Sequence, residues 1–103
     1  MPLYSYSKPV KPRKIKIIEI DLSTARNDEV IFSGYITSIS ILQRGNGSYS
    51  LKLIYLDGSS ETYSREELLS GMVFENIVKE IRFTNTAQSD VINPRIAVEY
   101  EVR

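Results

Sequence analysis

The sequence contains no cysteine, no histidine and no tryptophan among its 103 residues. Without cysteine there can be no disulfides, which fits a reducing compartment or a particle assembled in one. Without histidine, the chain has neither the commonest metal ligand nor the only side chain that titrates unperturbed near neutral pH. These absences exclude the usual nucleophile–histidine pairs and zinc sites, and we expect no metal and no cofactor.

Carboxylate pairs are the catalytic option that remains. The close pairs are Asp28-Glu29, Glu66-Glu67 and Glu99 with Glu101, and each falls on a predicted turn or solvent-facing position. A glycosidase pair would instead need two carboxylates that face one cleft. The sequence therefore predicts a binding protein rather than an enzyme.

Long hydrophobic runs are also missing. No segment approaches the ~20 apolar residues that span a bilayer, and the N-terminal residues lack the apolar core of a signal peptide. We therefore expect a soluble protein without a membrane partner.

The net charge of zero conceals an uneven distribution of charge. The first 16 residues hold five cations and no acid, and the rest of the chain holds eight cations against thirteen acids. Three of the four prolines, Pro2, Pro9 and Pro12, lie in the same N-terminal region and disfavour a helix or a central strand there. We predict an extended, basic arm over residues 1–14 and one folded domain over residues 15–103.

The rest of the sequence indicates short strands. The expected strands cover residues 15–22, 30–32, 35–42, 49–56, 59–63, 72–75, 78–84 and 95–102. Asp57-Gly58 predicts a hairpin between two of them, and Ser64 with Glu67 has the capping-box pattern of a short helix that ends at Gly71. About eight short strands predict an all-β fold, a compact antiparallel β-sandwich of jelly-roll-like type with one short helix.

Three short motifs resemble a family of small structural proteins from tailed-bacteriophage virions. They are IDLSTAR at residues 20–26, LKL at residues 51–53 and RFTNTAQ at residues 82–88. The resemblance implies a jelly-roll-like sandwich that serves as a decoration, head-fibre or tail-associated component. It further implies an oligomer, with a trimer favoured, that is assembled in the host cytoplasm, is located in the virion and binds the major capsid protein or another virion protein.

The polar residues of these motifs are expected to form structural corners. Ser23 or Thr24 can hydrogen-bond nearby backbone, and Arg26 can pair with Asp21 or Asp28. Asn85 and Gln88, with Thr86, could fix the late loop in the same way. We interpret both motifs as structural corners rather than as a ligand site.

The arm is the predicted partner-binding segment. Its candidate contact residues are Tyr4, Tyr6, Lys8, Lys11, Arg13 and Lys14. Tyrosine is a favoured contact residue in protein interfaces. Nucleic-acid binding is the less favoured use of the arm, because the acidic body would repel a duplex.

The leading hypothesis is a capsid decoration protein that reinforces a shell, with its arm on a neighbouring subunit. A carbohydrate-binding module of a tail or fibre is the alternative. It would need Tyr35, Tyr49, Tyr55 or Tyr63 exposed together in a groove.

Overall fold

The computed structural model describes residues 12–102 of the chain. This part of the chain forms β1 (Arg13–Glu19), β2 (Arg26–Gln43), β3 (Ser50–Tyr55), β4 (Ser60–Ser64), the 3-10 turn η1 (Arg65–Glu67), β5 (Val73–Phe74), β6 (Val78–Asn85) and β7 (Arg95–Glu101). The seven strands form one sheet in the order β1-β7-β2-β6-β3-β4, and β5 also pairs with β2. Every pairing is antiparallel. The fold is therefore all-β, as the sequence predicts.

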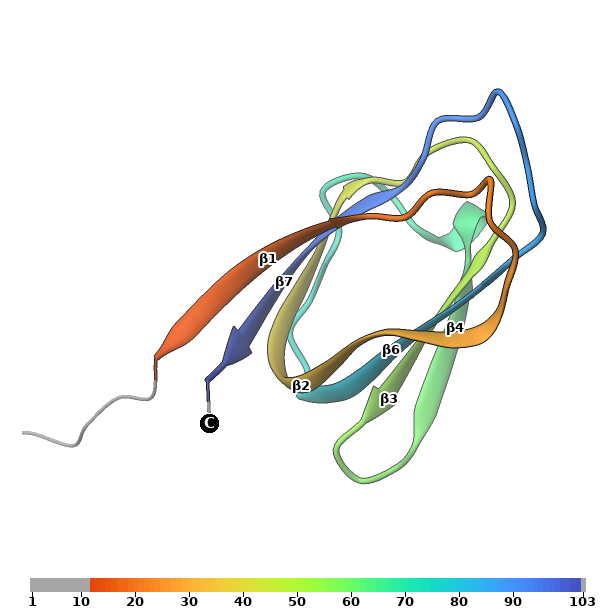
Figure 1. Ribbon diagram of the computed structural model, residues 1–103. Coiled ribbons are helices and arrows are strands. Elements are labelled where there is room, and N and C mark those ends of the chain that lie inside the picture. The colour runs from red at the N-terminus through yellow and green to blue at the C-terminus, as the bar shows by residue number, and fades with distance from the viewer. Residues whose placement is uncertain (1–11, 103) are drawn as a thin grey trace, which may run out of the picture.

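A single long strand gives the molecule its sandwich-like shape. The first part of β2 pairs with β6, and its second part pairs with β7. Figure 1 shows β2 bending between these two parts, so that the sheet folds over itself. The half made by β1, β7 and the end of β2 thus faces the half made by β6, β3 and β4.

The hydrophobic core fills the space between the two halves. Buried side chains come from β2 and β7 on one side and from β3 and β6 on the other; they include Ile36, Ile39, Ile41, Val98, Leu51, Leu53, Val78, Ile81 and Phe83. Leu51 and Leu53 are buried along β3, and Val78, Ile81 and Phe83 are buried along β6. Leu22 and Leu68, from connecting segments, are also buried in this core.

The strand count differs from the prediction at Gly34. The sequence predicts two strands, over residues 30–32 and 35–42, separated at Ser33-Gly34, but β2 runs through both. Gly34 has φ +152, a conformation that L-residues rarely adopt. The strand pairings shift register on both sides of this glycine. The glycine therefore bends one strand instead of ending it, which is how bulged strands change direction.

The two predicted local turns are both present. At Asp57-Gly58, the N–H of Gly58 donates to the carbonyl of Tyr55 at 3.0 Å and closes the hairpin. The Ser64 N–H donates to the Glu67 carboxylate at 2.9 Å, one half of the capping box. The helix is only one 3-10 turn; after it Leu68 is buried and Leu69 is exposed.

The folded part of the chain begins earlier than predicted. Arg13 and Lys14, assigned to the arm, lie in β1 opposite Glu101 and Tyr100 of β7. The N–H of Val102 donates to the carbonyl of Pro12 at 2.9 Å, so the pairing extends to that residue. Proline is tolerated there because its carbonyl remains available although it has no N–H.

Candidate functional site

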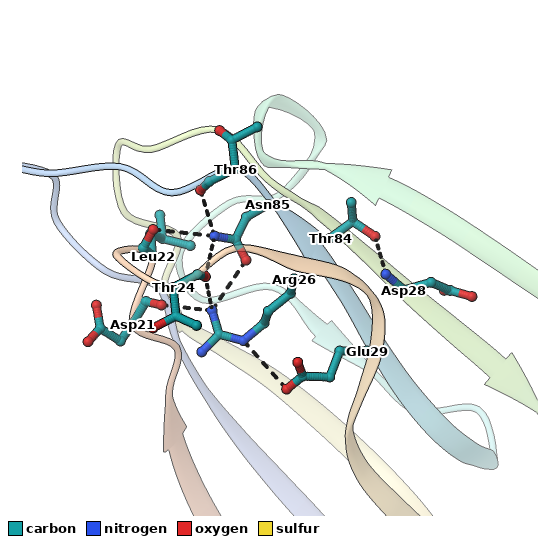
Figure 2. A network of polar contacts seen from close by, with 9 residues as sticks. All are labelled: Asp21, Leu22, Thr24, Arg26, Asp28, Glu29, Thr84, Asn85 and Thr86. Atoms are coloured by element: carbon teal, nitrogen blue, oxygen red, sulfur yellow. Dashed lines mark hydrogen bonds and ion pairs between the residues drawn. The ribbon is translucent and has the colours of Figure 1, made fainter.

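The IDLSTAR and RFTNTAQ motifs meet at one corner of the molecule. The segment between β1 and β2 carries the first motif, and the end of β6 carries the second (Figure 2). Arg26 donates from Nη1 to the carbonyls of Asp21 at 2.7 Å and Thr24 at 3.0 Å. The same atom donates to the Asn85 Oδ1 at 3.2 Å. We call this set of contacts the Arg26–Asn85 corner.

Asn85 is the only buried polar or charged residue among those described, at 6% exposure. Its Nδ2 atom lies within hydrogen-bond distance of three carbonyl oxygens: those of Leu22 at 3.3 Å, Thr24 at 3.0 Å and Thr86 at 2.7 Å. A buried amide is tolerated only when its donors and acceptor are satisfied, and here they are. Asn85 therefore joins the segment between β1 and β2 to the segment that follows β6, neither of which belongs to a strand.

Gln88 completes the corner on its other side. Its side chain accepts from the Ser48 N–H at 2.8 Å and donates to the Ser48 carbonyl at 2.7 Å, as a neighbouring strand would. Its own N–H donates to the Leu22 carbonyl at 2.9 Å. The loop before β3 approaches so closely that a Cβ at Gly47 would collide with Leu22 Cδ1 and lie 2.8 Å from Gln88 Oε1.

Asp21 contributes a local turn rather than an ion pair. Its carboxylate accepts the N–H of Ser23 at 2.9 Å, and this hydrogen bond lowers the pKa of Asp21 below its usual value. The predicted pairing of Arg26 with Asp21 uses the carbonyl of Asp21, whereas the carboxylate of Glu29 lies 3.8 Å from Arg26 Nε. The expected corner role of these residues thus depends on main-chain oxygens.

Asp28, the other acid considered for Arg26, belongs to a separate cluster. It has φ +53, and its N–H donates to the Thr84 hydroxyl at 2.9 Å. Its carboxylate lies 2.9 Å from Arg82 Nη1 and 4.0 Å from Lys52 Nζ. Hydrogen bonds to Glu80 and to Asp28 raise the pKa of Arg82. These contacts stabilise a backbone conformation that is uncommon for a non-glycine residue.

A shallow depression of about 430 Å³ lies beside the corner. It is open to solvent and is lined by Arg26, Asn27, Ser48, Tyr49, Ser50, Thr84, Asn85 and Thr86. The Arg26 and Asn85 side chains on its wall are already bonded within the fold. No group of three or more Asp, Glu, His or Cys residues that could hold a metal ion occurs within residues 12–102.

The tyrosines named by the carbohydrate hypothesis do not form an exposed groove. Tyr49 is buried and stacks on Phe83, with ring centroids 4.8 Å apart. Tyr55 and Tyr63 are half-buried, and both hydroxyls donate to the Glu61 carboxylate. Burial, and secondarily Glu61, raises the pKa of both tyrosines. Tyr35 is also only partly exposed.

The predicted arm residues fall into two groups. Tyr4, Tyr6, Lys8 and Lys11 lie outside the described residues. Arg13 lies in β1, with guanidinium nitrogens 3.8 Å from the Glu99 and Glu101 carboxylates of β7. Lys14 is exposed on the same strand.

β1 carries an exposed apolar pair that the sequence analysis did not single out. Ile15 and Ile17 are 69% and 56% exposed, although both are large and β-branched. The signal was present in the segment RKIKIIE, whose alternation places Ile15 and Ile17 on one strand face and Lys14 and Lys16 on the other. Such a pattern is typical of an edge strand, and β1 is at one edge of the described sheet.

The outer edge of β1 also presents backbone groups. The Ile20 N–H donates to the Pro94 carbonyl, and the Val102 N–H donates to the Pro12 carbonyl. The backbone polar groups of the even-numbered residues from Pro12 to Ile20 therefore point toward β7 and the residues that flank it. In an antiparallel pair the orientation alternates along the strand. The N–H and C=O groups of Arg13, Ile15, Ile17 and Glu19 therefore point away from the sheet. This edge, together with Ile15 and Ile17, is called the β1 edge here.

Comparisons with known proteins found no counterpart. No family model matches the chain, and neither a curated protein nor a solved structure matches it. No helix in the described part of the chain is long and apolar enough to cross a membrane.

Proposed function

We propose that the protein is a structural component of a virus particle, most simply an oligomeric capsid decoration protein that acts by binding other protein subunits. The observation that carries the binding role is the β1 edge: an apolar pair exposed on a sheet edge that directly follows a basic N-terminal segment. Added edge strands and exposed apolar patches are two recurring ways in which proteins bind one another. The virus setting rests on the resemblance of the motifs.

The bonding of the motif residues within the fold supports this proposal. The polar residues of the IDLSTAR and RFTNTAQ motifs bond to the protein's own main chain, so they serve the fold. The β1 edge, with the segment before it, is the surface that we assign to a partner. A decoration protein needs only such a contact: ~1,000 Å² per copy, repeated over a lattice, resists outward pressure through multivalency.

The virus setting is tested by locating the protein. Antibodies against the purified chain, coupled to gold, would be applied to virus particles isolated from lysed cultures of the source organism. We expect regular labelling of the particles in electron micrographs. Labelling absent from intact particles, with the protein recovered only in the particle-free supernatant, would contradict a virion role.

The role of the arm is tested by a truncation that the structure defines. Removing residues 1–11 takes away Tyr4, Tyr6, Lys8 and Lys11 but leaves β1 whole, whereas removing residues 1–14 would also shorten β1. We expect the shortened chain to keep the circular-dichroism spectrum of the full chain and to lose binding to particles stripped of the protein. Unchanged binding would remove the arm from the contact.

A further inference from the structure

The residues of the β1 edge are complementary to a second copy of themselves. The first residue of β1 is a cation, Arg13, and the last is an anion, Glu19. Ile15 and Ile17 lie between them. All four have outward-pointing backbone groups, and all four side chains lie on one face because strand side chains alternate. Reversing the direction of the strand therefore places unlike charges at both ends and the isoleucines in the middle.

We propose that two copies of the chain associate through the β1 edge as antiparallel neighbours related by a two-fold axis at Lys16. Arg13 then faces Glu19 of the second copy, and Ile15 faces Ile17 of the second copy. The proposal specifies the partner and register of the surface named under the proposed function, and it rests on that function only in taking β1 as a protein contact. The Arg13–Glu19 and Ile15–Ile17 pairs would each exchange two backbone hydrogen bonds.

The charges continue across both sheets in this register. Within one copy, Glu19 lies opposite Arg95 and Arg13 lies opposite Glu101. The carboxylate of Glu19 is 3.9 Å from the guanidinium of Arg95, and that of Glu101 is 3.8 Å from Arg13. The pairing of two copies would join these into one row of alternating sign, Arg95–Glu19–Arg13–Glu101. Opposite charges on neighbouring strands stabilise such rows.

The apolar pair is covered in the same register. Ile15 and Ile17 of each copy would cover those of the other, which removes from water the two most exposed isoleucines of the strand. Facing β-branched side chains are favourable cross-strand neighbours. Registers shifted by two residues along the strand would place Ile15 or Ile17 opposite its own copy, and Arg13 would no longer face Glu19. The charges thus select one register.

One contact in this arrangement is unfavourable. Lys16 lies on the two-fold axis and faces its own copy, and like charges directly opposite each other destabilise a strand pair. A lysine on an edge strand is also a common device that limits uncontrolled strand pairing. The association is therefore expected to be reversible, with a Kd of about 1–100 µM, in keeping with an interface below ~1,200 Å². Replacing Lys16 with threonine should tighten it several-fold.

The first measurement is the mass of the full-length chain across a range of concentrations, by sedimentation equilibrium. We expect a monomer–dimer equilibrium, and Ile17→Lys should weaken it about tenfold or more, because it places a buried cation against Ile15. Ile17 is exposed in the monomer, so the variant should fold, which circular dichroism checks. A chain that stays monomeric at millimolar concentration, or a trimer that Ile17→Lys leaves intact, would overturn the proposal.

The second measurement tests the register by mixing two charge-reversed variants. Arg13→Glu alone places Glu opposite Glu in its own dimer, and Glu19→Arg alone places Arg opposite Arg. In a mixed dimer, both ends would again join a glutamate and an arginine. We expect each variant alone to be mostly monomeric and the equimolar mixture to form a one-to-one dimer. Any unfavourable contact with β7 within each variant chain persists in the mixture. Relief of such a contact therefore cannot explain a dimer that forms only on mixing.

Glu75→Arg is the matched control, because Glu75 is exposed and lies far along the chain from β1. This variant should dimerise as the unchanged protein does, and it should not rescue Arg13→Glu on mixing. A mixture of Arg13→Glu and Glu19→Arg that stays monomeric would overturn the register. Gold labelling of virus particles does not depend on this dimer, so the failure of the dimer and the failure of the virion role can be told apart.

Discussion

The Nη1 atom of Arg26 lies 3.2 Å from the Oδ1 atom of Asn85, although the two residues are 59 positions apart in the sequence. Through this contact the start of β2 is joined to the end of β6, at the point where the chain from β1 enters the second half of the sheet. The contact fixes both the Arg26 guanidinium and the Asn85 amide, which then bind the carbonyls of the connecting segment. It is the centre of the Arg26–Asn85 corner.

Asn85 should contribute more to stability than its position at the end of β6 suggests. Asn85→Asp removes the donors that bind the carbonyls of Leu22, Thr24 and Thr86 and places a carboxylate against them. We expect the free energy of unfolding to fall by about 2 kcal/mol, measured by urea denaturation. Asn76→Asp, at an exposed position, should change it by less than about 0.5 kcal/mol. Equal effects of the two changes would contradict the role of Asn85.

Gly34 should be required for the bend in β2. At φ +152, an alanine would be strained even though a Cβ has space, its nearest neighbour being Phe32 Cε1 at 3.8 Å. Gly34→Ala should therefore lower the free energy of unfolding by about 1–3 kcal/mol. Ser33→Ala, next to it and also exposed, is the control and should be near neutral. Thermal unfolding followed by circular dichroism compares the two, and indistinguishable melting temperatures would count against the bend.

Tyr49 should make the protein less stable at high pH. Burial raises the pKa of Tyr49 from 10.0 to about 12, because the ionised phenol would have to be formed among apolar side chains. The folded pKa lies above the unfolded one, so this stabilisation is complete below pH 10 and is lost as the pH rises toward about 12.

Tyr49→Phe provides the comparison for the alkaline loss. This variant gives up the hydrogen bond from the Tyr49 hydroxyl to the Arg44 carbonyl at 2.7 Å, so it should be less stable at neutral pH. Its decline in unfolding free energy above pH 10 should nevertheless be smaller than that of the unchanged protein. Denaturant titrations at a series of alkaline pH values measure both slopes. Parallel declines would show that Tyr49 is not the responsible group.

Glu61 should contribute to the loss of stability in acid. Hydrogen bonds from the Tyr55 and Tyr63 hydroxyls lower the pKa of Glu61 below its usual value of 4.5. The contribution is therefore present above pH 4.5 and is lost as the pH falls through the lower, folded value. Side-chain NMR titration should place the midpoint of Glu61 below 4.5, and Glu61→Gln should reduce the acid dependence of unfolding. A midpoint at or above 4.5 would contradict the tyrosine contacts.

Much of the fold could be predicted because its signals are local. Alternation over residues 49–56 and the Asp57-Gly58 pair each specify structure within a few residues, and β3 and its hairpin are found where expected. The capping pattern of Ser64 and Glu67 likewise identified the position of the 3-10 turn, although not its shortness. The candidate site was predicted in part: the sequence named Arg26, Asn85 and Gln88 as corner residues, but not that they share one corner.

The amino-acid sequence by itself determined the strands, the hairpin and the all-β class, because period-two alternation and turn residues act over short distances. Only the tertiary structure decided that Arg26 and Asn85 bond to the same carbonyl, that of Thr24, because the two residues are brought together by the pairing of β2 with β6. It also decided that Gly34 bends one strand rather than ending it, and that Arg13 lies in β1 rather than in a free arm. The strands that pair with β2 around Gly34 are β6 and β7, and the strand that pairs with β1 at Arg13 is β7. These partners are distant in the sequence, so local patterns cannot reveal them.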